Sequence, residues 1–181
     1  MNYRQLQSEL NKNIFSSVYL FIAHDGYIAK SYAALIKKLA IDADFSEMNA
    51  NTFDDKSYDT QQIMNAVLTL PVMGARRVVE IDLDCYNKSG ELTDALTDYA
   101  ADPSDATVLI LRTAQIASTS ALYKVIEKTG KIVEFEKLSV YELKDWIKSS
   151  FKKRGLKINA EALEYLVEVG EIFERFRIDF Q

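Results

Sequence analysis

The segment VYLFIAHDGYIAKS, residues 18–31, joins an apolar run, a short polar turn and the start of a helical pattern. A phosphate-binding loop occupies such a position, and its pattern G-x-x-x-x-G-K-[ST] places Lys30 and Ser31 in the last two places. His24 and Ala29 replace the two glycines that the pattern requires. Because a Cβ atom at position 29 crowds the backbone around a phosphate, we favour a strand-to-helix turn that holds no ligand.

Apolar, β-branched segments and helical segments alternate along the chain on both sides of this turn. The expected strands are residues 17–23, 45–53, 76–84, 106–112 and 131–135, and the expected helices are 27–40, 59–70, 89–101 and 118–129. Such alternation predicts an α/β fold in which helices flank a parallel sheet. The segment TVLILR within 106–112 is almost entirely apolar, which is typical of a strand that is buried on both faces.

The helix expected at 59–70 has clear start and stop signals. Asp59 is suited to cap its first turn, Gln62 completes a capping box, and Pro71 ends the helical pattern. The predicted apolar face consists of Ile63, Ala66, Val67 and Leu70.

The character of the sequence changes after the last expected strand. Residues 138–155, LSVYELKDWIKSSFKKRG, begin with a capping box of Ser139 and Glu142 and end at Gly155, a residue suited to terminate a helix. The expected buried stripe of this helix is Leu143, Trp146, Ile147 and Phe151. A second helix is expected after Asn159. We therefore expect an α/β domain at residues 1–137 and a small helical module at 138–181.

Composition excludes several classes of protein. The chain has 181 residues, of which 48% are hydrophobic and 27% charged, so that it can form a packed core. A net charge of −5 argues against a protein whose whole surface binds nucleic acid. One cysteine and one histidine exclude an internal disulfide and a thiolate or histidine-rich metal site, so no metal and no cofactor are expected. We find no secretory signal and no membrane-spanning run, and we expect a cytoplasmic protein without membrane contact.

The third expected strand carries the acidic residues Glu80, Asp82 and Asp84 at alternate positions. An acidic pair that closes an apolar strand holds Mg²⁺ in nucleotide hydrolases, but here the acids interrupt the apolar run. Alternation places all three on one face, and we expect a polar strand side or a frayed end that meets solvent. The alternative is a nucleotide-binding ATPase of the P-loop type that uses Lys30, Ser31 and Asp82.

The segment TLPVMGARR, residues 69–77, places Val72 and Met73 in a loop before the third strand. Apolar side chains at a loop tip are candidates for a partner's pocket, and methionine suits an adaptable contact. The alternative is that both side chains tuck under the edge of the sheet. The composition of the segment favours neither the exposed nor the tucked-under arrangement of Val72 and Met73.

The helix that begins near residue 139 carries Lys144, Lys148 and Lys152 at intervals of four. Residues 141–158 contain six basic and two acidic side chains, which gives this stretch a local charge of +4. A phosphate or acidic partner such as DNA is one explanation, and a solvated lysine face is the other.

These features occur together, and in the same order, in one protein family. The sequence resembles the delta subunit of bacterial DNA polymerase III, the "wrench" of the clamp loader, over about residues 15–169. The resembling stretches are VYLFIAHDGYIAKSYAALIKKL, LTLPVMGARRVVEID, ATVLILR and ALYKVIEKTGKIVEFEKLSVYELKDWIKSSFKKRGLKINAEALEYLVE. The order and separation of these stretches carry the resemblance, since no single one of them is specific.

The resemblance implies an AAA+-like fold without ATPase activity, in a non-catalytic subunit of the polymerase III holoenzyme. It implies that the segment after helix 59–70 opens the sliding clamp with apolar side chains, a role that falls to Val72 and Met73 with Leu70 in support. The family usually has bulkier residues there, often with a phenylalanine. The implied partners are the sliding clamp (beta) and the gamma/tau and delta prime subunits, with DNA contacted weakly or indirectly.

Delta subunits continue into a third, helical collar domain, and the usual continuation is not recognisable after Gly170. The resemblance therefore implies a fragment or a natural truncation, for which stable assembly into the loader is not expected.

Overall fold

The computed structural model describes residues 1–24, 26–86, 90–135, 140–153 and 155–178. The chain divides into two compact units, residues 1–136 and 137–181. The domain boundary predicted from the sequence, between residues 137 and 138, lies outside the described residues.

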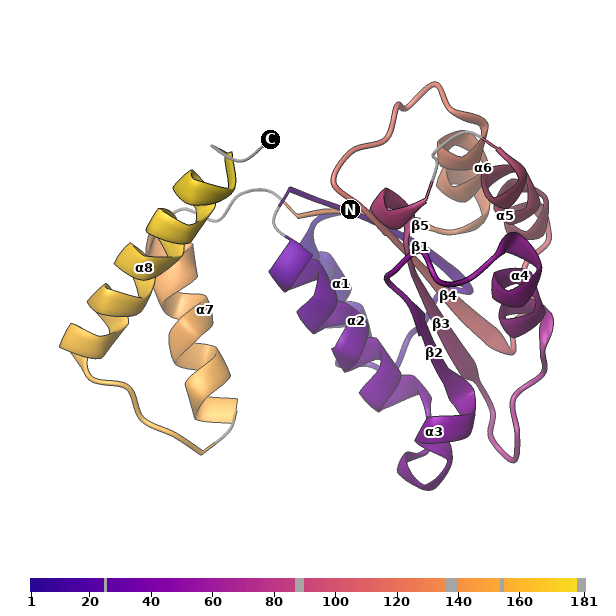
Figure 1. Cartoon of the computed structure of the whole chain (residues 1–181). Helices are drawn as coiled ribbons and strands as arrows, with labels where there is room; N and C mark the ends of the chain where they lie inside the picture. The colour runs from indigo at the N-terminus through magenta and orange to yellow at the C-terminus, as the bar shows by residue number, and fades with distance from the viewer. Residues whose placement is uncertain (25, 87–89, 136–139, 154, 179–181) are drawn as a thin grey trace. The chain divides into compact units, whose positions relative to one another are not determined.

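The first unit is built on a five-stranded parallel sheet in the order β2-β3-β4-β1-β5 (Figure 1). Its strands are β1 (Val18–Ala23), β2 (Ala50–Phe53), β3 (Arg77–Asp82), β4 (Thr107–Thr113) and β5 (Lys131–Phe135). Every residue of β4 is buried, as expected of a central strand with both faces covered. The predicted fold class, a parallel sheet flanked by helices, is confirmed.

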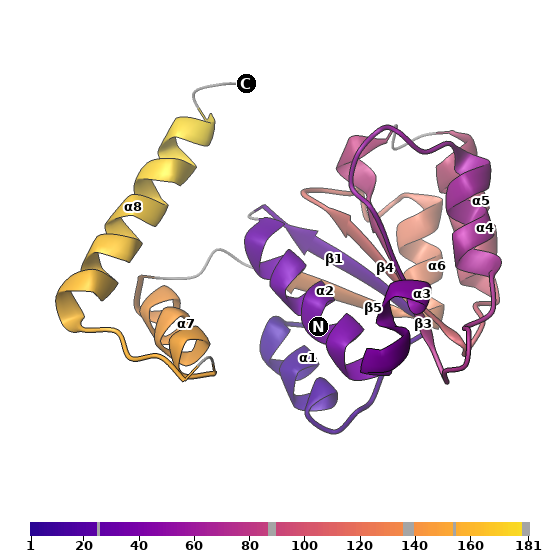
Figure 2. The ribbon, with the colours of Figure 1, turned by 60° about the horizontal axis from the view of Figure 1, so that its bottom comes forward.

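Helices cover both faces of this sheet, as Figures 1 and 2 show from two directions. One face carries α1 (Tyr3–Leu10) and α2 (Gly26–Ala40), and the other carries α4 (Thr60–Leu68), α5 (Glu91–Ala101) and α6 (Ala121–Thr129). On the α4–α6 face, Leu20 of β1 and Leu109 of β4 pack in one cluster with Ile63, Leu96 and Ile126. The α1–α2 face is aromatic, with ring contacts that link Tyr19, Phe21, Tyr32 and Phe135.

The strand expected at 45–53 is wrong in its first half. Residues 43–49 form the short helices η1 (Ala43–Phe45) and α3 (Ser46–Asn49), and only the last four residues join the sheet as β2. The Asp42 side chain accepts a hydrogen bond from the Asp44 amide and so starts the helical turn.

The signals at the start of α4 are confirmed, but its end differs from the prediction. Asp59 and Gln62 form the complete capping box, and Ile63 and Val67 are buried. The helix ends at Leu68, and Leu70 lies beyond it with its side chain 70% exposed, so Leu70 does not belong to the apolar face. Proline disfavours helical geometry in the residue before it, and Leu70 precedes Pro71.

The second unit is a pair of helices, α7 (Val140–Lys153) and α8 (Ala160–Ile178). Ile147 packs with Leu163 and Val167 of α8, and the expected stripe residues Leu143 and Phe151 lie against this cluster. Ser139 and the side chains of Glu142 and Trp146, which complete the predicted cap and stripe, are outside the described residues.

The loop between α7 and α8 ends one helix and starts the next with local hydrogen bonds. Gly155 has a φ of +71° and donates to the Lys152 carbonyl, while Leu156 donates to the Phe151 carbonyl. These bonds form a Schellman motif, so the predicted role of Gly155 is confirmed. The Asn159 side chain accepts from the Ala162 amide and caps α8. No helix in the described part of the chain is long and apolar enough to span a membrane.

Gly130, between α6 and β5, allows a close approach of two backbones. A Cβ atom there would lie 2.6 Å from the Val18 carbonyl oxygen and 3.1 Å from a methyl carbon of Ile126. We expect Gly130→Ala to lower the free energy of unfolding by about 1–3 kcal/mol, because backbone and packed core must shift. Gly26→Ala is the matched control, since nothing lies within 4 Å of its added Cβ. Equal urea midpoints for the parent and the Gly130 variant would contradict this prediction.

Candidate functional site

The first candidate is the turn between β1 and α2, at the carboxyl edge of the sheet. Ala29 is buried in the first turn of α2, and the Lys30 side chain is exposed. The Ser31 hydroxyl donates to the Tyr27 carbonyl of its own helix at 3.0 Å. The helix backbone therefore engages the serine hydroxyl of the phosphate-loop pattern.

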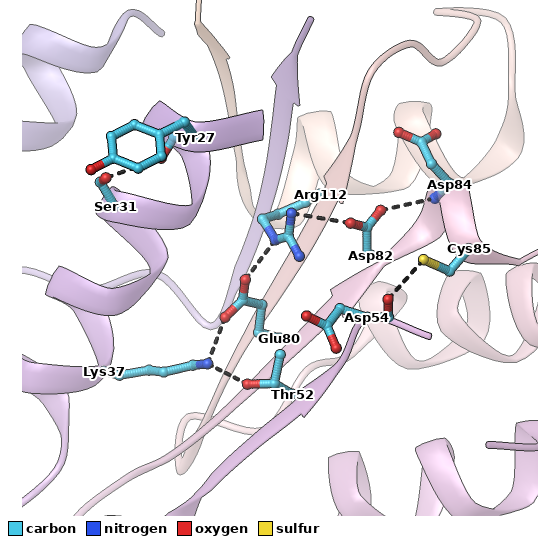
Figure 3. A network of polar contacts seen from close by, with 10 residues as sticks. All are labelled: Tyr27, Ser31, Lys37, Thr52, Asp54, Glu80, Asp82, Asp84, Cys85 and Arg112. Carbon is cyan, nitrogen blue, oxygen red and sulfur yellow. Dashed lines mark hydrogen bonds and ion pairs between the residues drawn. The ribbon is translucent and has the colours of Figure 1, made fainter. Parts of the chain in front are cut away.

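The acidic residues of β3 pair with cations of the chain itself (Figure 3). Arg112 Nε lies 2.5 Å from Glu80 Oε1, and Lys37 Nζ lies 2.5 Å from Glu80 Oε2. Arg112 Nη1 lies 3.2 Å from Asp82 Oδ2. Glu80 and Arg112 are only 5% and 4% exposed, so the expectation that this strand side meets solvent is wrong for Glu80. Burying an unpaired carboxylate is costly because the charge loses its hydration. The two cations, Lys37 and Arg112, offset this cost for Glu80.

Other polar groups at this edge are also used within the fold. Asp84 accepts hydrogen bonds from the Thr113 hydroxyl at 2.8 Å and from the Ala114 amide at 2.6 Å. Cys85 donates its thiol to the Asp54 carbonyl, and burial raises the pKa of this thiol. In the described ranges, no three His, Cys, Asp or Glu side chains are grouped so that they could hold a metal ion.

The residues required by the nucleotide-binding alternative have different surroundings. Lys30 faces solvent, Ser31 bonds to its own helix, and Asp82 pairs with Arg112. In nucleotide hydrolases a divalent cation neutralises the acids at the end of this strand. Here the guanidinium of Arg112 provides the positive charge next to Glu80 and Asp82. The arrangement therefore favours a structural role for this edge of the sheet.

The second candidate lies at the opposite edge. The loop 69–76 precedes β3, and because all strands are parallel it lies at the amino edge, away from the β1–α2 turn. The side chains of Leu70, Val72 and Met73 are 70%, 41% and 81% exposed. They do not tuck under the sheet edge, which was the alternative for Val72 and Met73. We call these three residues the apolar tip.

Two buried polar residues contact the backbone of this loop. Asn49, at the end of α3, makes two hydrogen bonds to Val72, and Arg77, at the start of β3, bonds to the carbonyls of Thr69 and Leu70. No role was predicted from the sequence for either residue: Asn49 belongs to no motif, and Arg77 is only the last residue of the segment 69–77. The available signal was a second arginine at the start of an apolar strand, where a charge has to find partners.

The lysine stripe of α7 is not uniform. Lys144 Nζ lies 2.5 Å from Glu164 Oε1 of α8, whereas Lys148 and Lys152 are exposed. A contact of this stripe with DNA therefore stays a prediction that depends on Lys148 and Lys152.

A family model described as "DNA polymerase III, delta subunit" matches residues 19–136, which include the degenerate turn, the apolar tip and all of the sheet except Val18. The chain belongs to the DNA polymerase III delta-subunit family. A curated family member, DNA polymerase III subunit delta of Bacillus subtilis (strain 168), is 25% identical over 168 residues. That match covers 87% of this chain and 48% of the relative, so the chain spans about half the length of the curated relative it matches.

Solved structures support the same fold. The Bacillus subtilis DNA clamp loader delta protein matches with a TM-score of 0.70 at 24% identity, covering 91% of this chain and 51% of that one. The Thermotoga maritima RuvB Holliday junction branch migration motor matches with a TM-score of 0.56 at 17% identity, covering 90% and 52%. At these identities the likeness shows the fold alone, and it confirms that this delta-family chain has an AAA+-like architecture.

Proposed function

We propose that the chain is a non-catalytic clamp-loader subunit that binds the sliding clamp through the apolar tip and opens it during DNA replication. One observation carries the proposal: in a member of the delta-subunit family, three apolar side chains project into solvent from a loop with an anchored backbone. Exposed apolar groups on a fixed support are typical of a surface that a partner covers.

The chemistry of the tip fits an apolar pocket on the partner. Leu70, Val72 and Met73 carry no charge, and Met73, the most exposed of the three, has the side chain that adapts most readily to a pocket. The surrounding clamp-loader subunits, gamma/tau and delta prime, are further proposed partners, with DNA contacted weakly. The proposed location is the cytoplasm.

The carboxyl edge of the sheet supports a role without catalysis. Arg112 pairs with both acids of β3, and Ser31 bonds to its own helix, so the turn serves as a scaffold. The apolar tip lies at the amino edge of the same sheet. The proposed function of the domain is therefore to recognise another protein.

Surface plasmon resonance with the cognate clamp immobilised tests the proposal. We expect the whole chain to bind reversibly with a dissociation constant in the micromolar range or below. A fluorophore pair across the clamp's subunit interface reports opening, which we expect as a loss of energy transfer when the chain is added. Absence of binding at all concentrations would contradict the proposed function.

A further inference from the structure

We infer that Asn49 and Arg77 are positioning residues that hold the apolar tip in its binding conformation, an inference that rests on the proposed function. Both side chains come from outside the loop 69–76, one from the end of α3 and one from the start of β3. Neither is on the exposed surface of the tip, so both act through the backbone they hold.

The side chain of Asn49 binds the backbone of Val72, the middle residue of the tip. It is fully buried, its Nδ2 donates to the Val72 carbonyl at 2.9 Å, and its Oδ1 accepts from the Val72 amide at 2.7 Å. Both ends of the amide group are therefore used on one residue of the loop. One side chain thus makes the same two kinds of bond, to an amide and to a carbonyl of one residue, that a neighbouring β-strand makes with its backbone.

Arg77 holds the start of the tip. The residue is 7% exposed, and its guanidinium donates through Nη1 to the carbonyls of Thr69 and Leu70, at 3.3 and 3.2 Å. Through Nη2 it donates to the Met48 carbonyl and to Asn51 Oδ1, at 3.0 and 3.1 Å. One side chain thus links the loop after α4 to the segment around the end of α3. Burial lowers the pKa of Arg77, and all four acceptors are neutral oxygens.

The backbone of Met73 shows that the loop is held in an unfavourable conformation. Its φ is +49°, in the left-handed region that residues with a Cβ atom rarely adopt, and its side chain is 81% exposed. Such a conformation persists only where the surrounding structure imposes it, and it is concentrated at functional positions. The bonds of Asn49 to Val72, the preceding residue, provide that constraint.

A loop that is already ordered binds more tightly than the same loop in a mobile state, because its conformational entropy is not lost on association. Losing the Asn49 contacts should therefore weaken clamp binding without changing any side chain that touches the clamp. It should also expose the Val72 amide to solvent exchange in the free protein. These two effects separate positioning from a general loss of stability.

The test compares Asn49→Ala with Val133→Ala, a core truncation on β5, at the sheet edge opposite to β2. Hydrogen exchange of single amides in the free chain is measured first, and clamp affinity by surface plasmon resonance second. For Asn49→Ala we expect about tenfold faster exchange of the Val72 amide and about tenfold weaker affinity. For Val133→Ala we expect neither change beyond what its lower global stability causes at all amides. Asn49→Asp keeps an oxygen for the Val72 amide but sets a second oxygen against the Val72 carbonyl, where Nδ2 donates in the parent, so it should also speed exchange of the Val72 amide selectively.

An unchanged Val72 exchange rate in Asn49→Ala would overturn the inference, and so would equal losses of affinity in the Asn49 and Val133 variants. If Asn49→Ala does not fold, the Asp variant decides, and an unchanged Val72 exchange rate in that variant would count against the inference. If the parent chain does not bind the clamp, the proposed function fails, while the exchange measurement still decides whether Asn49 holds the loop.

Discussion

Replacing Arg112 with alanine is expected to lower the free energy of unfolding of the first unit by about 3–5 kcal/mol. The guanidinium lies against Glu80 and Asp82, and Glu80 is almost completely buried. The variant removes one of the two cations at Glu80 and leaves Asp82 without its ion pair to Arg112. A buried charge that loses its partner keeps its desolvation cost, which makes the single truncation more damaging than removal of the whole pair.

Urea unfolding followed by far-UV circular dichroism measures this loss. The only tryptophan of the chain, Trp146, belongs to the second unit, so its fluorescence follows that unit separately. The control is the double variant Glu80→Leu/Arg112→Met, which replaces the charges by apolar groups and should recover most of the lost stability. A loss below about 1 kcal/mol in Arg112→Ala would contradict the structural role of the network.

Replacing both Val72 and Met73 with serine is expected to weaken clamp binding by about 100-fold or more. The side chains are 41% and 81% exposed in the free chain, and the proposed pocket removes their apolar surface from water. Complete burial of such a side chain stabilises a complex by about 1.5–3 kcal/mol. Their joint loss therefore corresponds to a factor of about 100, at 1.4 kcal/mol for each tenfold.

The matched control is Leu156→Ser/Tyr165→Ser in the second unit, where both side chains are also exposed, at 56% and 66%. It removes a similar amount of exposed apolar surface from residues that do not belong to the tip. Surface plasmon resonance should show parent-like affinity for this control. A change of less than about threefold in Val72→Ser/Met73→Ser, or the same loss in both double variants, would exclude the tip as the binding surface.

Much of the fold could be predicted because its signals are local. The apolar run of β4, the capping box of Asp59 and Gln62, and the glycine after α7 each act within a few residues of their own position. Period and capping chemistry in a sequence report such contacts directly. The order of helices and strands, and hence the parallel sheet, follows from them.

The remaining features depend on pairs that are distant in the sequence. Glu80 looked like the polar side of a strand because its partners, Lys37 and Arg112, come from other elements. Asn49 lies 23 residues before Val72, and no local pattern announces that the two are bonded. The tip residues could be named from the family resemblance, whereas their exposure and the side chains that hold them required coordinates.

The most direct test of the central claim places a photoreactive diazirine analogue of methionine at position 73 and irradiates the chain with the cognate clamp. The same group at position 156, in the second unit, is the control. We predict a covalent adduct with the clamp from position 73 and none from position 156. A chain that binds the clamp without an adduct from position 73, or with equal adducts from both positions, would contradict it.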